Sequence, residues 1–145
     1  MNIVYKISTA NYDNILGHLL KCSDNFIPHL TDTVDINIYA KKIIDKAICF
    51  EAWDNEELIG LIAAYFNDEK EHKGYITNVS TVKEYFGKGI GAQLMKMCID
   101  YATTHQFKEI ILEVRKQNTA IRLYEKYQFA VVSENNDMLT MKRII

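Results

Sequence analysis

The chain has 145 residues, 48% of them hydrophobic and 25% charged, a balance typical of a soluble globular protein that excludes a disordered or membrane-spanning chain. We therefore expect a single domain over residues 1–145. The formal net charge of −2 excludes a basic field for nucleic acid, so any anion must be bound locally.

The N-terminal stretch predicts a strand followed by two helices. Residues 2–7 alternate in polarity as a strand does, and they hold no apolar run long enough for a signal peptide or a spanning helix. Apolar residues then recur at helical spacing over 12–20 and over 38–46. The candidate N-caps are Ser8 or Thr9 for the first helix and Thr33 or Asp35 for the second.

Between these helices the chain passes through Phe26-Ile27-Pro28-His29-Leu30, which contains the only proline of the sequence. Proline fixes the backbone, so we expect this segment to be a non-helical elbow. Large apolar residues in such an elbow have two interpretations, a plug over the core or a loop that contacts substrate. The sequence leaves both open.

The middle of the chain changes from helical to strand-like periodicity. Residues 47–53 and 58–66 flank the turn Asp54-Asn55-Glu56 and predict a central hairpin. A polar connection leads to residues 74–82, whose β-branched side chains predict a further strand. That strand runs directly into a cluster of glycines.

Three of the six glycines, Gly87, Gly89 and Gly91, stand at alternate positions where a helical pattern begins. Glycines at this spacing let backbone N–H groups converge, and a helix that starts there adds the positive end of its dipole. The pattern is typical of a phosphate seat, and the same glycines would also serve an ordinary turn. It matches neither G-x-x-x-x-G-K-[ST] nor G-x-G-x-x-G, which excludes those two phosphate loops.

The C-terminal part predicts two more helices and three strands. A helix of roughly four turns is expected from the glycine cluster to near His105. The elements expected after it are a strand at 110–114, a helix from Asn118 or Thr119 to Tyr127, and short strands at 129–132 and 138–141.

The cysteines and histidines form no metal or redox motif. The three cysteines make no C-x-x-C pair and leave an odd number, so we interpret them as reduced core thiols of a cytoplasmic protein. His18, His72 and His105 fall on polar helix or loop positions and are expected to be solvated. We expect no metal.

Two segments carry a resemblance to a known family. Residues 78–91, a strand that leads into Tyr85-Phe86-Gly87-Lys88-Gly89-Ile90-Gly91, resemble the core motif of the GNAT N-acetyltransferase superfamily, a strand followed by [Q/R]-x-x-G-x-[G/A]. The segment Leu112-Glu113-Val114, followed by Asn118 and by Leu123-Tyr124 to Phe129, resembles the second motif, a strand, an Asn and a helix bearing Y-x-x-x-G-F. Order and spacing agree across residues 58–132.

The resemblance implies an α/β (α+β) fold, with a mixed, mostly antiparallel sheet of about six to seven strands splayed into a V and flanked by about four helices. It implies that acetyl-CoA lies in the opening, with its pantetheine arm along the main chain of Val79, Ser80 and Thr81, next to Asn78. The implied seat for its pyrophosphate is formed by the backbone amides of Phe86, Gly87, Lys88, Gly89, Ile90, Gly91 and Ala92.

The resemblance also implies roles for individual side chains. Tyr124 matches the family's tyrosine that hydrogen-bonds the leaving sulfur and acts as general acid; its other interpretation is a core aromatic. Asn118 matches the asparagine that contacts the cofactor arm, and it can also be a helix N-cap. Asn78 is a second catalytic candidate.

Three positions depart from the family pattern. Phe86 replaces a Gln or Arg, which removes a side-chain contact to the pyrophosphate and leaves the backbone donors. Lys83 stands where a proline is frequent. Gln128 replaces the turn glycine before Phe129, which predicts a strained left-handed backbone at Gln128.

No motif fixes the general base or the acceptor. The function we expect is transfer of the acetyl group of acetyl-CoA to a primary amine of a small molecule, by direct attack in a ternary complex. A protein or peptide N-acetyltransferase and a non-catalytic CoA-binding or regulatory domain are the alternatives. We expect a monomer or homodimer with no nucleic-acid or membrane partner. The candidate acceptor-pocket residues are Phe26, His29, Glu51, Tyr65, Asn67 and Tyr75.

Overall fold

The computed structural model describes residues 2–26 and 28–145; Met1 and Ile27, the latter in the expected elbow, lie outside the described residues. Seven strands of the described chain form one sheet, in the order β1-β2-β3-β4-β5-β7-β6. Neighbouring strands are antiparallel except β4 and β5, which are parallel. The strands are β1 (Ile3–Ile7), β2 (Ile48–Asp54), β3 (Glu57–Tyr65), β4 (Lys73–Thr81), β5 (Glu109–Arg115), β6 (Ala130–Asn135) and β7 (Met138–Ile144).

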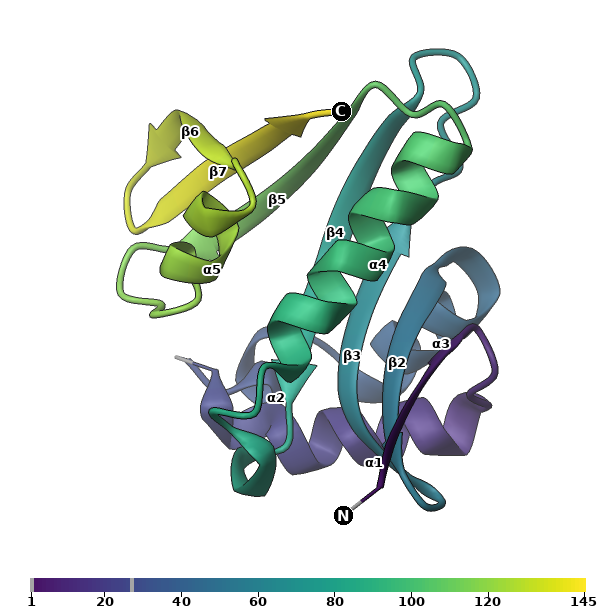
Figure 1. The fold of residues 1–145 in the computed structure, drawn as a ribbon. Helices are drawn as coiled ribbons and strands as arrows, with labels where there is room; N and C mark the ends of the chain where they lie inside the picture. The colour runs from purple at the N-terminus through teal and green to yellow at the C-terminus, as the bar shows by residue number, and fades with distance from the viewer. Residues whose placement is uncertain (1, 27) are drawn as a thin grey trace.

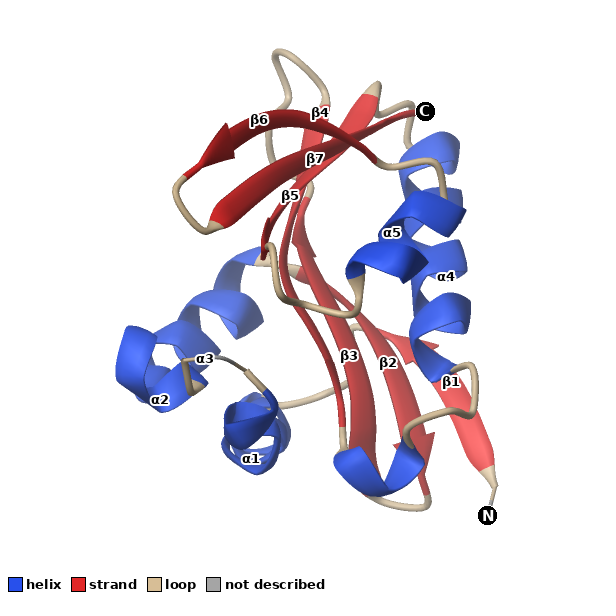
Figure 2. Cartoon of the chain, turned by 90° about the vertical axis from the view of Figure 1, so that its left-hand side faces the viewer, coloured by secondary structure: helices blue, strands red, loops and turns tan. Residues whose placement is uncertain are grey.

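Helices cover both faces of this sheet (Figure 1). The α-helices are α1 (Tyr12–Cys22), α2 (Leu30–Thr33), α3 (Ile36–Lys46), α4 (Ile90–Thr104) and α5 (Ile121–Lys126). Helices α1 and α3 lie on one face of β3 and β4, and α4 lies on the other (Figure 2). The single turn α2 was not predicted. None of the helices in the described ranges is long and apolar enough to cross a membrane.

The N-cap predicted for α3 is confirmed, whereas the one predicted for α1 is wrong. Asp35 caps α3, since its side chain accepts hydrogen bonds from the backbone N–H groups of Asn37 and Ile38, as expected. The expected cap of α1 at Ser8 or Thr9 is wrong, because Asn11 forms a capping box with Asn14. Thr9 instead donates hydrogen bonds to the buried carboxylate of Glu51.

Alternating side chains of β3 divide the core into two clusters. Ile62 and Ala64 belong to the cluster under α4, whereas Leu61 and Ala63 belong to the cluster under α1 and α3. A Cβ at Gly60 would lie 2.6 Å from Cγ2 of Ile90, so glycine is what lets the first residue of α4 approach β3 this closely.

The sheet opens into a V between its two parallel strands. Strands β4 and β5 are paired only where residues 73–76 face residues 109–112. Beyond this point β4 continues beside β3, while β5 continues beside β7, so the two strands diverge (Figure 1). The expected splayed, mixed sheet is therefore confirmed.

The turn after α5 has the expected left-handed backbone. Gln128 has a φ of 64°, and the N–H of Phe129 bonds back to the carbonyl oxygen of Tyr124 at 3.0 Å. A residue with a Cβ is strained in this region, so the turn carries a steric cost that glycine would not have.

Replacement of Gln128 by Gly should therefore raise the free energy of unfolding by about 1 kcal/mol, measured by denaturant titration. Gln128→Ala is the matched control, because alanine keeps the left-handed strain and should give no gain. A glycine variant less stable than the wild type would contradict this account.

Candidate active site

Two adjoining cavities occupy the opening of the V. The first, of about 480 Å³, lies between β4, β5 and the elbow after α1. The second, of about 520 Å³, lies between the end of β4, the glycine loop and the start of α5. Phe26, Val79 and Asn118 line both cavities, so the two form one continuous site.

The edge of β4 that faces the opening has backbone groups without a partner strand. The N–H of Val82 donates to the carbonyl oxygen of Ile59 on β3, and alternate residues direct their backbone groups to opposite edges. Val79 and Thr81 therefore direct theirs into the opening, where the side chain of Asn25 donates to the Thr81 carbonyl oxygen at 3.2 Å. An extended ligand can pair with this edge as an added strand would.

The glycine loop forms the wall of the second cavity. Gly87 and Gly89 have φ values of 77° and 74°, and Gly89 is the N-cap of α4 with no side-chain cap. The first N–H groups of a 15-residue helix are thus left for a ligand. Of the predicted loop residues, those in the cavity wall are Phe86, Gly87, Gly89, Ile90, Gly91 and Ala92, whereas the exposed Lys88 is not among them.

A tyrosine fixes the position of this loop. The hydroxyl of Tyr85 donates to Oδ2 of Asp54, the last residue of β2, at 2.6 Å. That hydrogen bond raises the pKa of Tyr85 to about 12 and lowers the pKa of Asp54. The loop is therefore tied to the central hairpin before it reaches the glycines.

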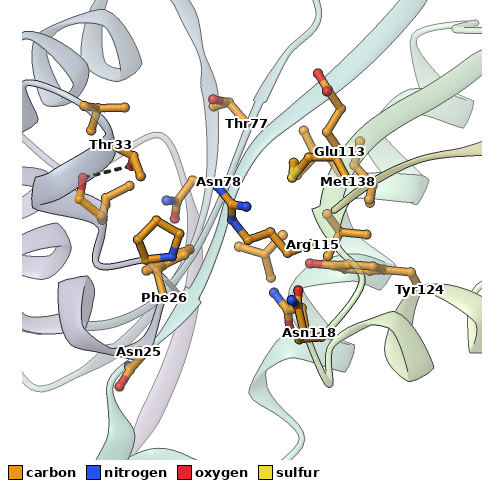
Figure 3. A pocket seen from close by; sticks show the side chains of 18 of the residues that line it. Asn25, Phe26, Thr33, Thr77, Asn78, Glu113, Arg115, Asn118, Tyr124 and Met138 are labelled. Carbon is orange, nitrogen blue, oxygen red and sulfur yellow. Dashed lines mark hydrogen bonds between the residues drawn. The ribbon is translucent and has the colours of Figure 1, made fainter. Parts of the chain in front are cut away.

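Tyr124 on α5 faces the first cavity. Its ring is buried, with 4% of the residue exposed, and its hydroxyl is directed into the cavity (Figure 3). Burial raises the pKa of Tyr124 above its ordinary value. At neutral pH the hydroxyl is therefore protonated and can donate to a ligand atom.

Asn118 combines a structural contact with a position in the site. The expectation that it is the helix N-cap is wrong, because Ala120 is the N-cap of α5 and has no side-chain cap. Oδ1 of Asn118 instead accepts a hydrogen bond from the N–H of Ala120 at 2.8 Å, which stabilises the turn into α5. The side-chain NH₂ group is left as a donor next to both cavities.

Asn78 and Ser80 are buried residues of β4 that form part of the cavity walls. Asn78 lines the first cavity and Ser80 the second, and both are largely buried. The sequence placed both residues near a cofactor, and the structure places both in the walls of the site.

Among the predicted acceptor residues, only Phe26 lines either of these two cavities. His29 is exposed and lies 3.4 Å from Asp24, and Asn67 is exposed in the loop after β3. Tyr65 is stacked under the ammonium of Lys42, 5.1 Å from the ring centre. Tyr75 is not itself in the wall but donates to one wall residue, Glu113, at 3.0 Å.

Glu51 has a structural position outside both cavities. Its fully buried carboxylate accepts hydrogen bonds from the backbone N–H groups of Thr9 and Ala10, the Thr9 hydroxyl and Nε1 of Trp53. These donors occupy its oxygens, so Glu51 anchors the segment before α1 and does not face the acceptor space.

Sequence reasoning missed two charged residues of β5 in the first cavity. Glu113 and Arg115 alternate with buried Leu112 and Val114 and lie across the opening from Thr77 and Asn78 (Figure 3). Glu113 supplies the carboxylate of that wall. Burial, together with the hydrogen bond to Glu113, raises the pKa of Tyr75 to about 12. The alternation of charged and apolar residues along β5 was the available signal in the sequence. The charged face lies in a cavity only because β4 and β5 diverge there.

No cluster of three or more His, Cys, Asp or Glu that could hold a metal occurs within residues 2–26 and 28–145. All three cysteines are buried and free. The expectation that His18 is solvated is wrong, because His18 is 3% exposed.

The family model of the acetyltransferase (GNAT) family matches residues 15–129. The chain belongs to the GNAT acetyltransferase family. Its fold matches PaiA N-acetyltransferase from Thermoplasma acidophilum, crystallised with coenzyme A, with a TM-score of 0.78 at 17% identity over 100% of both chains. At that identity the likeness shows the GNAT fold alone.

Curated relatives match the chain over part of its length. A probable spermine N(1)-acetyltransferase of Bacillus subtilis subsp. natto is 29% identical over 92 residues, 60% of each chain. N-alpha-acetyltransferase 30 of Xenopus laevis is 33% identical over 85 residues, 57% of this chain and 31% of that protein. The chain spans about a third of the length of this second relative.

Proposed function

We propose that this protein is an acetyl-CoA-dependent N-acetyltransferase that acetylates the primary amine of a small molecule. The observation that carries the proposal is the arrangement of three features around one opening: the unpaired edge of β4, the glycine loop at the start of α4, and the buried hydroxyl of Tyr124. The first fits a pantetheine arm, the second a pyrophosphate and the third a leaving sulfur.

Bound acetyl-CoA would supply an activated thioester, and the chain would supply orientation and proton transfer. Val79 and Thr81 would hold the arm through their backbone, and the N–H groups from Gly87 to Ala92 would hold the diphosphate. Tyr124 would give its hydroxyl proton to the sulfur that leaves when the amine displaces it from the acetyl group. Glu113 would take the proton that the amine loses, directly or through water.

The walls of the first cavity support a small acceptor. Its volume, about 480 Å³, is in the range of small-molecule sites, and its wall combines apolar elbow residues with Glu113 and Arg115. The spermine acetyltransferase relative supports the same class. The relative that is an N-alpha-acetyltransferase makes a peptide N-terminus the second candidate. The three free thiols support a reducing compartment such as the cytoplasm.

The proposal is tested first by ligand-induced stabilisation. Acetyl-CoA at 100 times its Kd should stabilise the protein by about 2.7 kcal/mol, read as a rise in Tm. Gly89→Val should weaken acetyl-CoA binding at least tenfold, because valine cannot adopt the φ of 74° without moving the loop.

The matched control for that variant is Gly17→Ala, an exposed helical glycine with open space around it. It should keep the full acetyl-CoA shift. A wild-type protein that acetyl-CoA does not stabilise would refute both the enzyme and the non-catalytic CoA-binding alternative.

Tyr124→Phe should lower kcat about 100-fold and leave the KM for acetyl-CoA within threefold, because it removes the proton donor and keeps the ring. The measurement is thiol release in a screen of polyamines, amino acids and short peptides. Tyr127→Phe, at the C-cap of the same helix and outside both cavity walls, is the control and should be unaffected. Normal turnover by Tyr124→Phe would exclude this residue as the acid.

Glu113→Gln should lower kcat/KM for the amine 10- to 100-fold at pH 7, because an amide cannot accept the amine proton. The loss should shrink as the pH approaches the pKa of the amine, where the free base is already present. Glu125→Gln, an exposed carboxylate on α5, is the control. A pH-independent defect would instead assign Glu113 to binding.

A further inference from the structure

Arg115 brings an unpaired positive charge into the first cavity. Its side chain extends from β5 into the opening of the V, on the side that faces Asn78 (Figure 3). The next cation along the chain, Lys116, is paired with Glu134. Within the part of the chain that the structure describes, no hydrogen bond or ion pair engages the guanidinium of Arg115. Its donors are therefore left for a ligand.

Glu113 lies on the same face of β5 and does not neutralise Arg115. The two residues alternate with buried neighbours, so their side chains leave the strand about 6.6 Å apart, two residue rises of about 3.3 Å. The hydroxyl of Tyr75 donates to Oε1 of Glu113 at 3.0 Å, which holds the carboxylate in place. The wall of the first cavity thus presents two opposite charges side by side that are not paired with each other.

The opposite wall strengthens the field of these charges. The side chains of Phe26, Leu30 and Tyr39 line the cavity across from β5. Apolar surface lowers the local dielectric, so a contact between charges in the cavity is stronger than one on the open surface. Arg115 is itself partly buried, so an anionic ligand would replace water that its guanidinium has lost.

The negative groups of the cofactor do not account for Arg115. The glycine loop that we propose as the diphosphate seat belongs to the second cavity, whereas Arg115 lines the first cavity and not the second. The thioester end of acetyl-CoA, which would lie near Tyr124, carries no charge. An anionic group that reaches Arg115 would therefore belong to the acceptor.

We propose that Arg115 binds a carboxylate of the acceptor, so that the substrate is an amino acid or a similar small molecule with both a primary amine and a carboxylate. The inference rests on the proposed function for the reaction. A planar guanidinium donates two parallel hydrogen bonds to a carboxylate, which fixes the orientation of the ligand as well as its position. The amine of the same molecule then stays within reach of Glu113, two residues along the strand.

The charge balance of this wall favours a carboxylate over a phosphate or a second amine. The charges of Glu113 and Arg115 sum to zero, as do those of the ammonium and carboxylate of an amino acid. A doubly charged phosphate would face one cation beside an anion, and a polyamine would place a positive charge against Arg115. Both of these arrangements include a like-charge repulsion.

Pairs of acceptors that differ only in the carboxylate test this inference. The pairs are tyrosine and tyramine, histidine and histamine, and ornithine and putrescine. In the preferred pair, kcat/KM of the wild type should be at least tenfold higher for the amino acid. Arg115→Gln should lower this ratio 10- to 100-fold, the range that one hydrogen bond between charged groups supplies. Arg115→Lys keeps the charge without the planar fork and should lie between.

The ratio isolates the carboxylate contact, because the intrinsic reactivity of each amine is the same for every variant. Arg122→Gln is the matched control, since it removes the same charge from an exposed position on α5 outside both cavity walls, and it should keep the wild-type ratio. The shift in Tm induced by acetyl-CoA shows that each variant is folded.

Three outcomes would overturn the proposal. An equal loss for both members of a pair in Arg115→Gln would assign the residue to the fold or to the cofactor. A wild-type protein that prefers the decarboxylated amine would exclude a carboxylate contact. Phosphoethanolamine preferred over ethanolamine by more than any amino acid over its partner would make the bound group a phosphate.

Binding measured without turnover separates this inference from the proposed function. Each amine is titrated calorimetrically into the protein saturated with CoA, which has no acetyl group to transfer. The amino acid should bind at least tenfold more tightly than its decarboxylated partner, and Arg115→Gln should remove the difference. If this pattern appears and no amine is acetylated, the proposed function fails and the carboxylate site stands. If no amino acid binds more tightly than its partner, the carboxylate site is refuted even where amines are acetylated.

Discussion

The active-site region depends on one interruption of strand pairing. The two parallel strands β4 and β5 separate after Ile76 and Leu112, although each keeps an antiparallel partner on its other side. Backbone N–H and C=O groups need partners, so an unpaired inner edge in an otherwise complete sheet is a ready acceptor for an extended ligand. Helices α1, α3 and α4 hold the β4 arm of the V, and the β6–β7 hairpin holds the β5 arm.

The site uses few charges, which agrees with the small net charge of the chain. The diphosphate seat that we propose consists of backbone N–H groups at the start of α4, so it needs no side-chain contact from the exposed Phe86. Tyr124, which we propose as the proton donor, keeps its hydrogen because burial raises its pKa and disfavours the phenolate. Only Glu113 and Arg115, on the far wall, bring formal charge to the first cavity.

A bulge in β4 decides which of its side chains face α1 and which face α4. Ala63 pairs with Asn78 and Ala64 with Ile76, so Thr77 is an extra residue and the two flanking side chains lie on opposite faces. Simple alternation would place Asn78 on the same face as Ile76, under α4. The bulge instead turns Asn78 and Ser80 toward α1, where His18 completes a buried hydrogen-bonded chain.

The sequence by itself determined the strands, the longer helices, the family and the left-handed turn at Gln128, because these depend on local spacing and on backbone geometry of single residues. Only the tertiary structure decided that Glu51 is an anchor, that His18 is buried and that Glu113 and Arg115 line the cavity. Those outcomes depend on contacts between residues that are tens of positions apart. Strand divergence and the bulge, which create those contacts, leave no periodic signal in the sequence.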